Sequence, residues 1–541
     1  MKKWLKRIAF ALAALVTLGA LLFAEENYRG KRAWEACKKE LEARGEKLDW
    51  AAIAPSAVPD DENFARTPFL VDWMNRRTDA TNEPAEEGTN STSRLPRYQW
   101  QWTYYSGAPG NWRSGTVPEP VEWQQRLRAQ DTGQMDRRMA ERYGLVKSGA
   151  SGTPAPAQGQ GSSADSFPLP RIADPDWLAL RARPPGTPME DMLFLLRQHE
   201  VEMDELRAAA RRPYVILETN AFDPARALPR LASLKALVYP FRASACIQLE
   251  AGHPETALAD LRVLFALGQT ASSQPVLIGS LVRLAITGLA IDPIWFGLAR
   301  HRWQDAQLAE LETSLANINI VADFQHCLRG DRTYALAALG EGGQPSESDR
   351  AVQSVGTNGR AGPAPDRTMR SLPGAFRYQN LASLVRTTQV LIDKLNPAGP
   401  SVRLSTNLEQ EVRASLGKRT LYNSLARMLL PALSKSLERA AYGQAAVSLA
   451  RVACALERHR LATGSYPEKL DGLTPRFIDR LPPDPVNGEP LKYRRDAPDR
   501  FILYSVGANL KDDGGRVDVD DLGRIRNRGQ GDWVWRSEPV K

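Results

Sequence analysis

An apolar run near the start of the chain constrains its fold more than any other feature. Ile8–Ala24 contains no charged residue, and it is preceded by four basic residues and followed at once by Glu25 and Glu26. A basic stretch followed by an apolar one is typical of an export signal. As a helix the run is roughly 25 Å long, which suffices to cross a bilayer that thins slightly around it. The sequence therefore predicts attachment to the bacterial inner membrane.

The end of the run favours an uncleaved signal anchor over a cleaved signal peptide. Cleavage requires small residues at both ends of an A-x-A triplet, whereas the run ends Leu22-Phe23-Ala24. A buried core helix is the third reading, and the lopsided flanking charges speak against it. Because basic residues stay in the cytoplasm, residues 1–26 are expected to form a single-pass anchor with the bulk of the chain outside the cytoplasm.

The composition of the remaining chain indicates folded domains. Its 541 residues suffice for about three or four folding units. The mean hydropathy of −0.40 excludes a polytopic membrane protein. The net charge of +8 is too small for this length to indicate nucleic acid as a partner. The four cysteines lie far apart without metal-type spacing, so we expect buried thiols and no disulfide framework: Cys37, Cys246, Cys327 and Cys454.

Shifts between apolar-periodic and Gly/Pro/Ser-rich sequence predict a mostly α-helical chain in several parts. Helical spacing of Trp34, Cys37 and Leu41 extends the anchor helix up to Pro55. The predicted parts after the anchor are an N-terminal region with an aromatic strand around Tyr98–Tyr105 (27–147), a linker (148–170), an irregular α-helical domain (171–340), a linker (341–373), a helical segment (374–430) and an α+β domain (431–541).

Two local patterns define the helical middle. Thr187, Pro188 and Glu190 are the N-cap, N1 and N3 residues of a capping box, so a helix begins there. Apolar helical patterns flank Gly252-His253-Pro254, which predicts an αα-hairpin resembling one tetratricopeptide repeat. The apolar segment Val276–Ala299 contains Arg283 and Asp292, so core helices are favoured there over a second membrane span.

The C-terminal part predicts one long helix, a proline-rich loop and three short strands. An apolar stripe from Tyr442 to Leu456 ends near Gly464, a good helix-terminating residue. Gly464-Ser465-Tyr466-Pro467 and Leu481-Pro482-Pro483-Asp484-Pro485 follow in the loop. Phe501, Leu503 and Ser505 then alternate as in a strand, and Asp532-Trp533-Val534-Trp535 forms the last one.

This ordered set of residues resembles the globular domain of the major pseudopilin of type II secretion systems. That family pairs a helix ending in G-x-Y-P with an L-P-x-D-P loop and a strand ending in Y-S-x-G before an acidic loop. The resemblance covers about the last 100 residues, and the apolar run lacks the family's acidic residue. It implies that the acidic loop binds calcium through the matching positions Asn509, Asp512, Asp513 and Asp532.

The residues themselves leave two readings of that loop open. Its five aspartates could supply oxygen ligands to calcium: Asp512, Asp513, Asp518, Asp520 and Asp521. The same loop could be merely solvated, with its charge balanced by Arg516, Arg524, Arg526 and Arg528.

Enzyme signatures are absent from the sequence, which predicts no catalytic residue. There is no G-x-S-x-G or Walker A motif, and Met203 stands where a zinc-protease helix starting at His199-Glu200 needs its second histidine. His199 and His459 are expected at the surface. The sequence thus favours a membrane-anchored envelope protein that interacts with or scaffolds a protein partner. The alternative is an envelope hydrolase that uses paired carboxylates.

Overall fold

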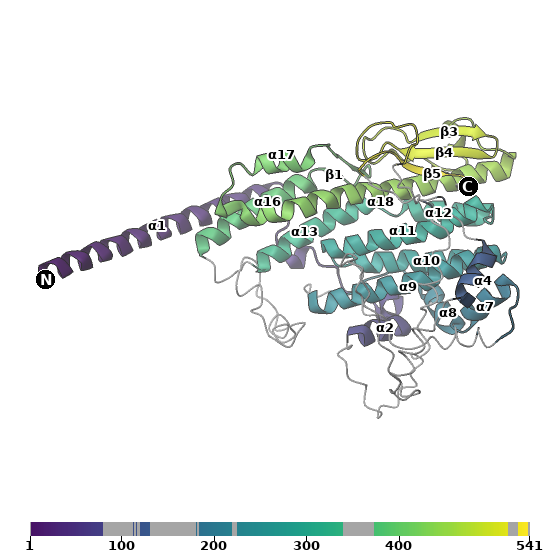
Figure 1. Cartoon of the computed structure of the whole chain (residues 1–541), viewed down its shortest axis with the longest axis horizontal. Helices are drawn as coiled ribbons and strands as arrows, with labels where there is room; N and C mark the ends of the chain where they lie inside the picture. Colours follow the sequence, from purple (N-terminus) through teal and green to yellow (C-terminus); the bar gives the residue numbers. More distant parts are fainter. Residues whose placement is uncertain are drawn as a thin grey trace, which may run out of the picture.

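A computed structural model describes residues 2–78, 112, 115, 119–129, 180, 183–218, 224–338, 373–517 and 529–538. The predicted aromatic strand and the linker at 148–170 lie outside these residues, as does the linker at 341–373 apart from Pro373. The chain is mostly helical, as predicted, with an apolar helix at its N-terminus and a small sheet at its C-terminus (Figure 1).

The first helix, α1 (Lys2–Ala43), is continuous from the apolar run into the body of the protein. The expectation that it extends to Pro55 is wrong. Gly45 takes a left-handed conformation (φ 80°), and the N–H of Glu46 returns to the carbonyl of Leu41 at 3.0 Å. Both features are typical of a helix end, because only glycine adopts this conformation without strain.

Shorter helices follow and cover one side of the body. They are α2 (Pro68–Thr78), α4 (Pro120–Ala129), α7 (Pro188–Arg197) and α8 (Glu200–Ala209), with 3₁₀ turns η1 (Trp50–Ala52), η2 (Asp60–Glu62) and η3 (Phe64–Arg66). The predicted start of α7 is confirmed, since Thr187 and Glu190 form a reciprocal capping box. The predicted hairpin is confirmed as well: α9 (Pro224–Glu250) packs along α10 (Pro254–Ser272), and Gly252 has a φ of 83° in the turn.

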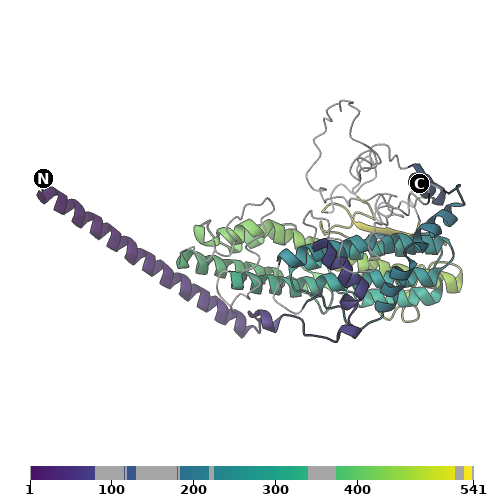
Figure 2. The same cartoon turned by 90° about the horizontal axis from the view of Figure 1, so that it is seen from below.

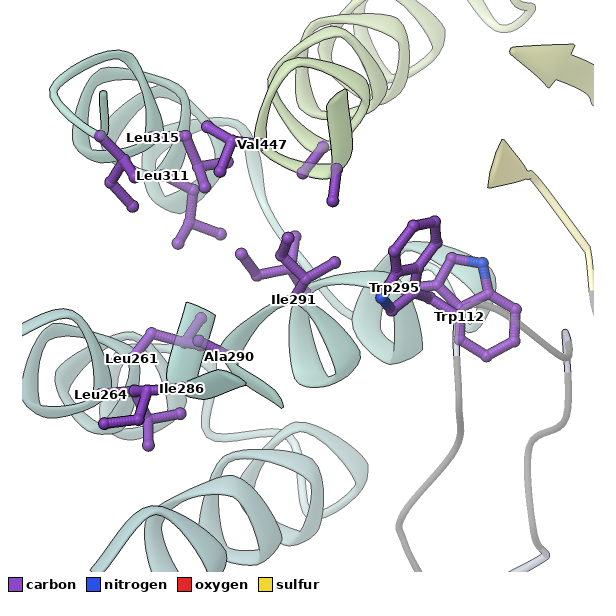
Figure 3. Packing of buried hydrophobic residues seen from close by; sticks show 14 of the residues in the cluster. Trp112, Leu261, Leu264, Ile286, Ala290, Ile291, Trp295, Leu311, Leu315 and Val447 are labelled. Atoms are coloured by element: carbon purple, nitrogen blue, oxygen red, sulfur yellow. The ribbon is translucent and has the colours of Figure 1, made fainter. Parts of the chain in front are cut away.

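Helix α11 (Leu277–Ala299) lies at the centre of the core. It packs against α9, α10, α13 (Ile320–Ala338) and α18 (Ser424–Thr463), and α12 (Asp305–Ala316) lies beside α18. In Figure 3, Ile291 of α11 lies between α10 on one side and α12 and α18 on the other. Leu311 and Leu315 of α12 and Val447 of α18 face it. In the described residues α11 and the N-terminal helix are the two helices apolar enough to span a membrane, but 61% of the apolar window of α11 is buried. This confirms α11 as a core helix.

The C-terminal sheet packs against α18. The loop segment between α16 (Gly374–Ile392) and α18 contains the short strands β1 (Leu395–Asn396) and β2 (Ser401–Val402), α17 (Leu408–Ser415) and the 3₁₀ turn η6 (Leu421–Asn423). After α18 and η7 (Leu470–Leu473), strands β3 (Lys492–Ala497), β4 (Arg500–Ser505) and β5 (Trp533–Arg536) form an antiparallel sheet in the order β3-β4-β5. Phe501 and Leu503 of β4 join the main core, as their alternation predicts.

The predicted end of α18 is confirmed by Gly464, which takes the left-handed conformation (φ 86°) at its C-cap. One hydrophobic cluster includes side chains from Phe64 to Trp535, so α18 and the sheet share the core of the helical body. The predicted start of the α+β domain, residue 431, lies inside α18. The division into domains stays a prediction.

All four cysteines are buried and free, as expected. His199 differs from the prediction: its side chain is buried, with 1% exposed, and the residue is the N-cap of α8. The charged neighbours in sequence misled the surface prediction, because the α7–α8 junction turns this position toward the core.

Candidate functional site

The acidic loop brings the four predicted positions together. β4 ends at Ser505, and the chain then turns at Gly507 (φ 72°) into a loop that an isolated bridge, Val517 to Gly531, joins to the segment before β5. This bridge places Asp532 beside the loop. The backbone N–H of Asp513 donates to Asp532 Oδ1 at 3.2 Å, although the two residues are far apart in the sequence.

Hydrogen bonds within the chain occupy many of the oxygens in this cluster. Asp532 is only 2% exposed, and its other oxygen accepts the N–H of Gly515 at 2.7 Å. Asp512 Oδ1 accepts the hydroxyl of Tyr504 at 2.9 Å and the N–H of Gly514 at 3.0 Å. Asn509 donates its amide N–H to Asp513 Oδ2 at 2.7 Å. The cluster therefore already serves as a brace between β4 and β5.

The negative charges of the cluster would favour a cation, but the described side chains do not form a complete cation site. Burial raises the pKa of Asp532, and the nearby charges of Asp513 and Asp512 raise it further. Burial and Asp512 together raise the pKa of Tyr504 to about 12. Calcium takes about six to eight oxygens. In the part of the chain that the structure describes, no group of three or more His, Cys, Asp or Glu side chains is arranged to hold a metal ion. Asp518, Asp520 and Asp521 lie outside the described residues, so calcium binding stays a prediction.

Asp484, in the proline-rich loop, has a structural role. Its carboxylate accepts the hydroxyl of Ser505 at 2.8 Å and the N–H groups of Val506 (3.0 Å) and Val486 (3.1 Å). Burial raises its pKa, and these three bonds oppose that rise. The side chain is 1% exposed and fixes the loop to the end of β4.

A second polar cluster, not predicted, links α18 to the turn after α11. His301 has a left-handed backbone (φ 52°), and its Nδ1 lies 2.8 Å from Glu457 Oε1. Glu457 also accepts hydrogen bonds from Tyr466 (2.8 Å) and Arg460 (2.7 Å). Burial alone would raise the pKa of Glu457, but the bonds from Arg460, His301 and Tyr466 outweigh it and lower the pKa to about 2.

This second cluster is suited to stability more than to proton transfer. A general base works best with a pKa near the operating pH, and a carboxyl with a pKa of about 2 holds its negative charge throughout the neutral range. His301 and Glu457 are 156 positions apart in the chain. No local motif in the sequence indicates that they meet.

Two further carboxylates with raised pKa values have separate structural partners. Burial raises the pKa of both Asp260 and Asp331 to about 6. Asp260 accepts a hydrogen bond from Arg207 at 2.7 Å, and Asp331 accepts the N–H of Leu277 at the start of α11 at 3.1 Å. In the described parts of α10 and α13, Asp260 therefore belongs to an ion pair and Asp331 binds a helix terminus. The two acids do not share a proton.

The junction between α1 and the body is the most extensive unexpected arrangement. Trp34, Cys37 and Leu41 of α1 are buried against Leu381, Ala382, Val385 and Leu336. The contact is close: a Cβ added to Gly30 would lie 3.2 Å from the backbone of Ala375. Asn27 accepts the N–H of Ala375 at the start of α16.

Buried charges fix the far end of the same junction. Glu46 follows α1 and accepts hydrogen bonds from Arg329 (2.9 Å) and Arg332 (2.6 Å) of α13. Burial opposes ionisation of Glu46, but the two guanidinium groups prevail and lower its pKa to about 2. Arg332 Nη1 also donates to Gln389 of α16 at 2.6 Å. The end of α1 is thereby joined to two helices of the body.

Upstream of this junction, α1 leaves the body entirely. No residue of its apolar window is buried, and Phe10, Leu15 and Leu21 are among its exposed side chains. In Figures 1 and 2 the N-terminal part of α1 projects beyond the ends of α16 and α18. An exposed apolar helix of this kind is compatible with a membrane anchor or a signal sequence.

No family model, curated protein or solved structure matches this chain.

Proposed function

We propose that this protein is a single-pass protein of the bacterial inner membrane whose helical body lies outside the cytoplasm and scaffolds or binds a protein partner. The observation that carries the proposal is the division of α1 at Glu26. Before this residue the helix is apolar and exposed, and after it the helix is packed into the body.

Retention of the apolar run is favoured by the packing of α1. The same helix that would cross the membrane continues without a break into the junction with α16. A signal peptide needs no rigid connection to the mature protein, whereas an anchor that sets the position of the body benefits from one. The buried ion pairs of Glu46 and the close approach at Gly30 supply that rigidity.

A scaffolding role is supported by the chemistry of the buried charged groups. Glu46 and Glu457 have pKa values lowered to about 2 by ion pairs that join distant elements. These groups stabilise the fold and do not resemble an acid and a base of matched pKa. The hydrolase alternative therefore gains no support from the described carboxylates.

A link to secretion rests on the resemblance of the C-terminal region to the major pseudopilin. The helix that ends at Gly464 and the antiparallel sheet after it agree with the layout that the resemblance implies. In this chain, however, α18 is enclosed by α11, α12 and α16. We therefore propose a partner role beside such a system and not assembly into a pseudopilus.

The experiment is a topology test in bacterial cells. A periplasm-active reporter fused after Lys541 should be active, and the fusion should stay in the membrane pellet after alkaline carbonate extraction. Leu15→Arg combined with Leu18→Arg should release the protein or block its export, since each charge opposes insertion by about 2.5 kcal/mol or more. Replacement of the exposed Leu461 by Arg is the matched control and should leave the location unchanged. An inactive reporter on a stable fusion would exclude the proposed topology.

A further inference from the structure

The end of the body nearest the apolar run carries exposed apolar and basic side chains together. We call it the basal surface: Lys418, Arg419, Leu421, Met428 and Leu429. Leu421 in η6 is 74% exposed, and Met428 in the first turns of α18 is 67% exposed. Lys418 and Arg419 are exposed in the preceding loop. Single exposed apolar residues are ordinary on protein surfaces. The functional interpretation of this group therefore depends on its position relative to the apolar run.

Hydrogen bonds place the basal surface beside the end of the apolar run. Glu26 accepts a hydrogen bond from the side-chain amide of Gln379 in α16 at 3.3 Å, and the next residue, Asn380, donates to the carbonyl of Leu421 at 2.8 Å. The start of α18 is fixed in turn to α16, because Asn380 Oδ1 accepts the N–H of Leu425 at 3.1 Å. Since the apolar run ends at Ala24, two residues before Glu26, these bonds through α16 place η6 beside the end of the run. Figure 2 shows α1 leaving the body at this end.

Two aromatic residues on α1 independently indicate the position of the membrane interface relative to η6. Trp4 is 70% exposed and Tyr28 is 65% exposed. Along a helix they are about 36 Å apart, which brackets a hydrocarbon core about 30 Å thick. Trp and Tyr prefer the two head-group regions of a bilayer. Tyr28 is two residues from Glu26, so the head groups on the body's side lie at the height of η6.

The charges of this region complement anionic head groups. Lys418 and Arg419 extend into solvent. Arg427 donates to neutral oxygens, the carbonyl of Gly417 and the side chain of Asn423, so its charge is oriented without being neutralised. Of the two acids at this level, Glu26 is engaged by Arg29 and Gln379, and Glu25 is exposed. Basic residues near a bilayer are attracted to anionic lipids, and exposed apolar side chains enter the interface.

We propose that the basal surface rests on the anionic lipid head groups of the membrane that α1 crosses. Leu421, Met428 and Leu429 enter the interface, and Lys418 and Arg419 contact lipid phosphates. The body then has two attachments to the bilayer and a fixed orientation over it. This inference rests on the proposed anchoring by α1, and the test below separates the two.

The test reads lipid contact at single positions of the full chain in vesicles. Cysteine is introduced at Met428, at Leu461 or at Leu15 and is labelled with a fluorophore. The native cysteines do not compete, because all four thiols are buried. Leu461 is the matched control, exposed on the same helix about 50 Å from Met428. Lipids with a quencher at the head group or deep in the acyl chain report the depth of each label. Vesicles contain phosphatidylcholine alone or mixed with an equal amount of phosphatidylglycerol.

The expected result is a graded pattern. The label at residue 15 is quenched by the deep quencher in both vesicle types. The label at residue 428 is quenched by the head-group quencher, several-fold more with phosphatidylglycerol, and the label at residue 461 is quenched by neither. The double variant Lys418→Glu, Arg419→Glu should remove most of the lipid dependence at residue 428.

The outcomes distinguish the two claims. Quenching at residue 15 with none at residue 428 would overturn this inference and leave the anchor standing. Absence of quenching at residue 15 would overturn both. Quenching at residue 428 that ignores phosphatidylglycerol and the charge reversal would overturn the role of anionic lipid.

Discussion

Glu46 Oε2 lies 2.6 Å from Nη2 of Arg332, and the Arg332 side chain is fully buried. The pair joins the third residue after α1 to α13. Because a buried charge without its partner costs far more than an exposed one, this contact makes the position of α1 sensitive to single substitutions.

Arg332→Met should lower the free energy of unfolding by about 3–5 kcal/mol, because it leaves Glu46 buried with fewer donors. Arg386→Met is the matched control: Arg386 pairs with Glu40 at 3.9 Å between α16 and α1, and both side chains are half exposed. Its loss should cost at most about 1 kcal/mol. Denaturant unfolding in detergent measures both, and equal losses would contradict the importance of the buried pair.

Low pH should weaken the junction between α1 and the body, because it protonates Glu46. Its pKa in the folded state is about 2, below its ordinary value of 4.5. A lowered pKa means that the stabilisation is complete above pH 4.5 and is lost as the pH falls toward 2. The loss should be at most about 3 kcal/mol, because solvent partly screens the Arg329 pair. Asp260 and Asp331 titrate in the opposite sense, so the useful quantity is the difference between wild type and Glu46→Gln. This difference should shrink steadily below pH 4.5, and a constant difference would contradict the assignment.

Helix α13 should not tolerate a side chain at Gly330. A Cβ there would lie 1.6 Å from the carbonyl oxygen of Pro275, so the backbone before α11 would have to move. Gly330→Ala should therefore destabilise the protein by about 2 kcal/mol or more. Gly268→Ala in α10 is the control, since its nearest new contact would be 3.5 Å, and alanine there should stabilise the helix by up to about 1 kcal/mol. Similar melting temperatures for the two variants would refute the close contact between α13 and Pro275.

Local sequence signals predicted much of the fold. They did not predict the contacts between residues that are distant in the sequence. Thr187 and Glu190 define the start of α7 within four residues, and Gly464 ends α18 by its own backbone preference. By contrast, the pairing of His301 with Glu457 depends on how α11 and α18 pack, and the burial of His199 depends on the angle between α7 and α8. Periodicity reports which face of a helix is apolar but not which helix covers it.

The acidic loop shows the same limit in the candidate site. The resemblance grouped Asn509, Asp512, Asp513 and Asp532 as calcium ligands, and the structure shows contacts of Asp513 with Asn509 and with Asp532. It did not reveal that Tyr504 and the backbone N–H groups of Gly514 and Gly515 already bind these carboxylates. Hydrogen bonds from the backbone leave no trace in the residue types.

Calcium binding predicts a measurable change in stability. If the loop binds the ion, the full chain in detergent should melt at a higher temperature in millimolar calcium than in chelator, because a ligand of the native state stabilises it by mass action. Asp512→Ala should remove most of the difference, and magnesium should substitute poorly. Asp499→Ala, in the β3–β4 turn, is the control and should keep it. Equal melting in calcium and chelator would leave a solvated acidic loop, braced by its own hydrogen bonds.

Retention of the apolar part of α1 is the central claim, and mass spectrometry of the N-terminus tests it most directly. Protein extracted from membranes should yield peptides that cover Ile8–Ala24, at the same abundance as peptides from the buried junction around Trp34. A mature protein that begins after Ala24 and is recovered in the soluble fraction would contradict the anchor.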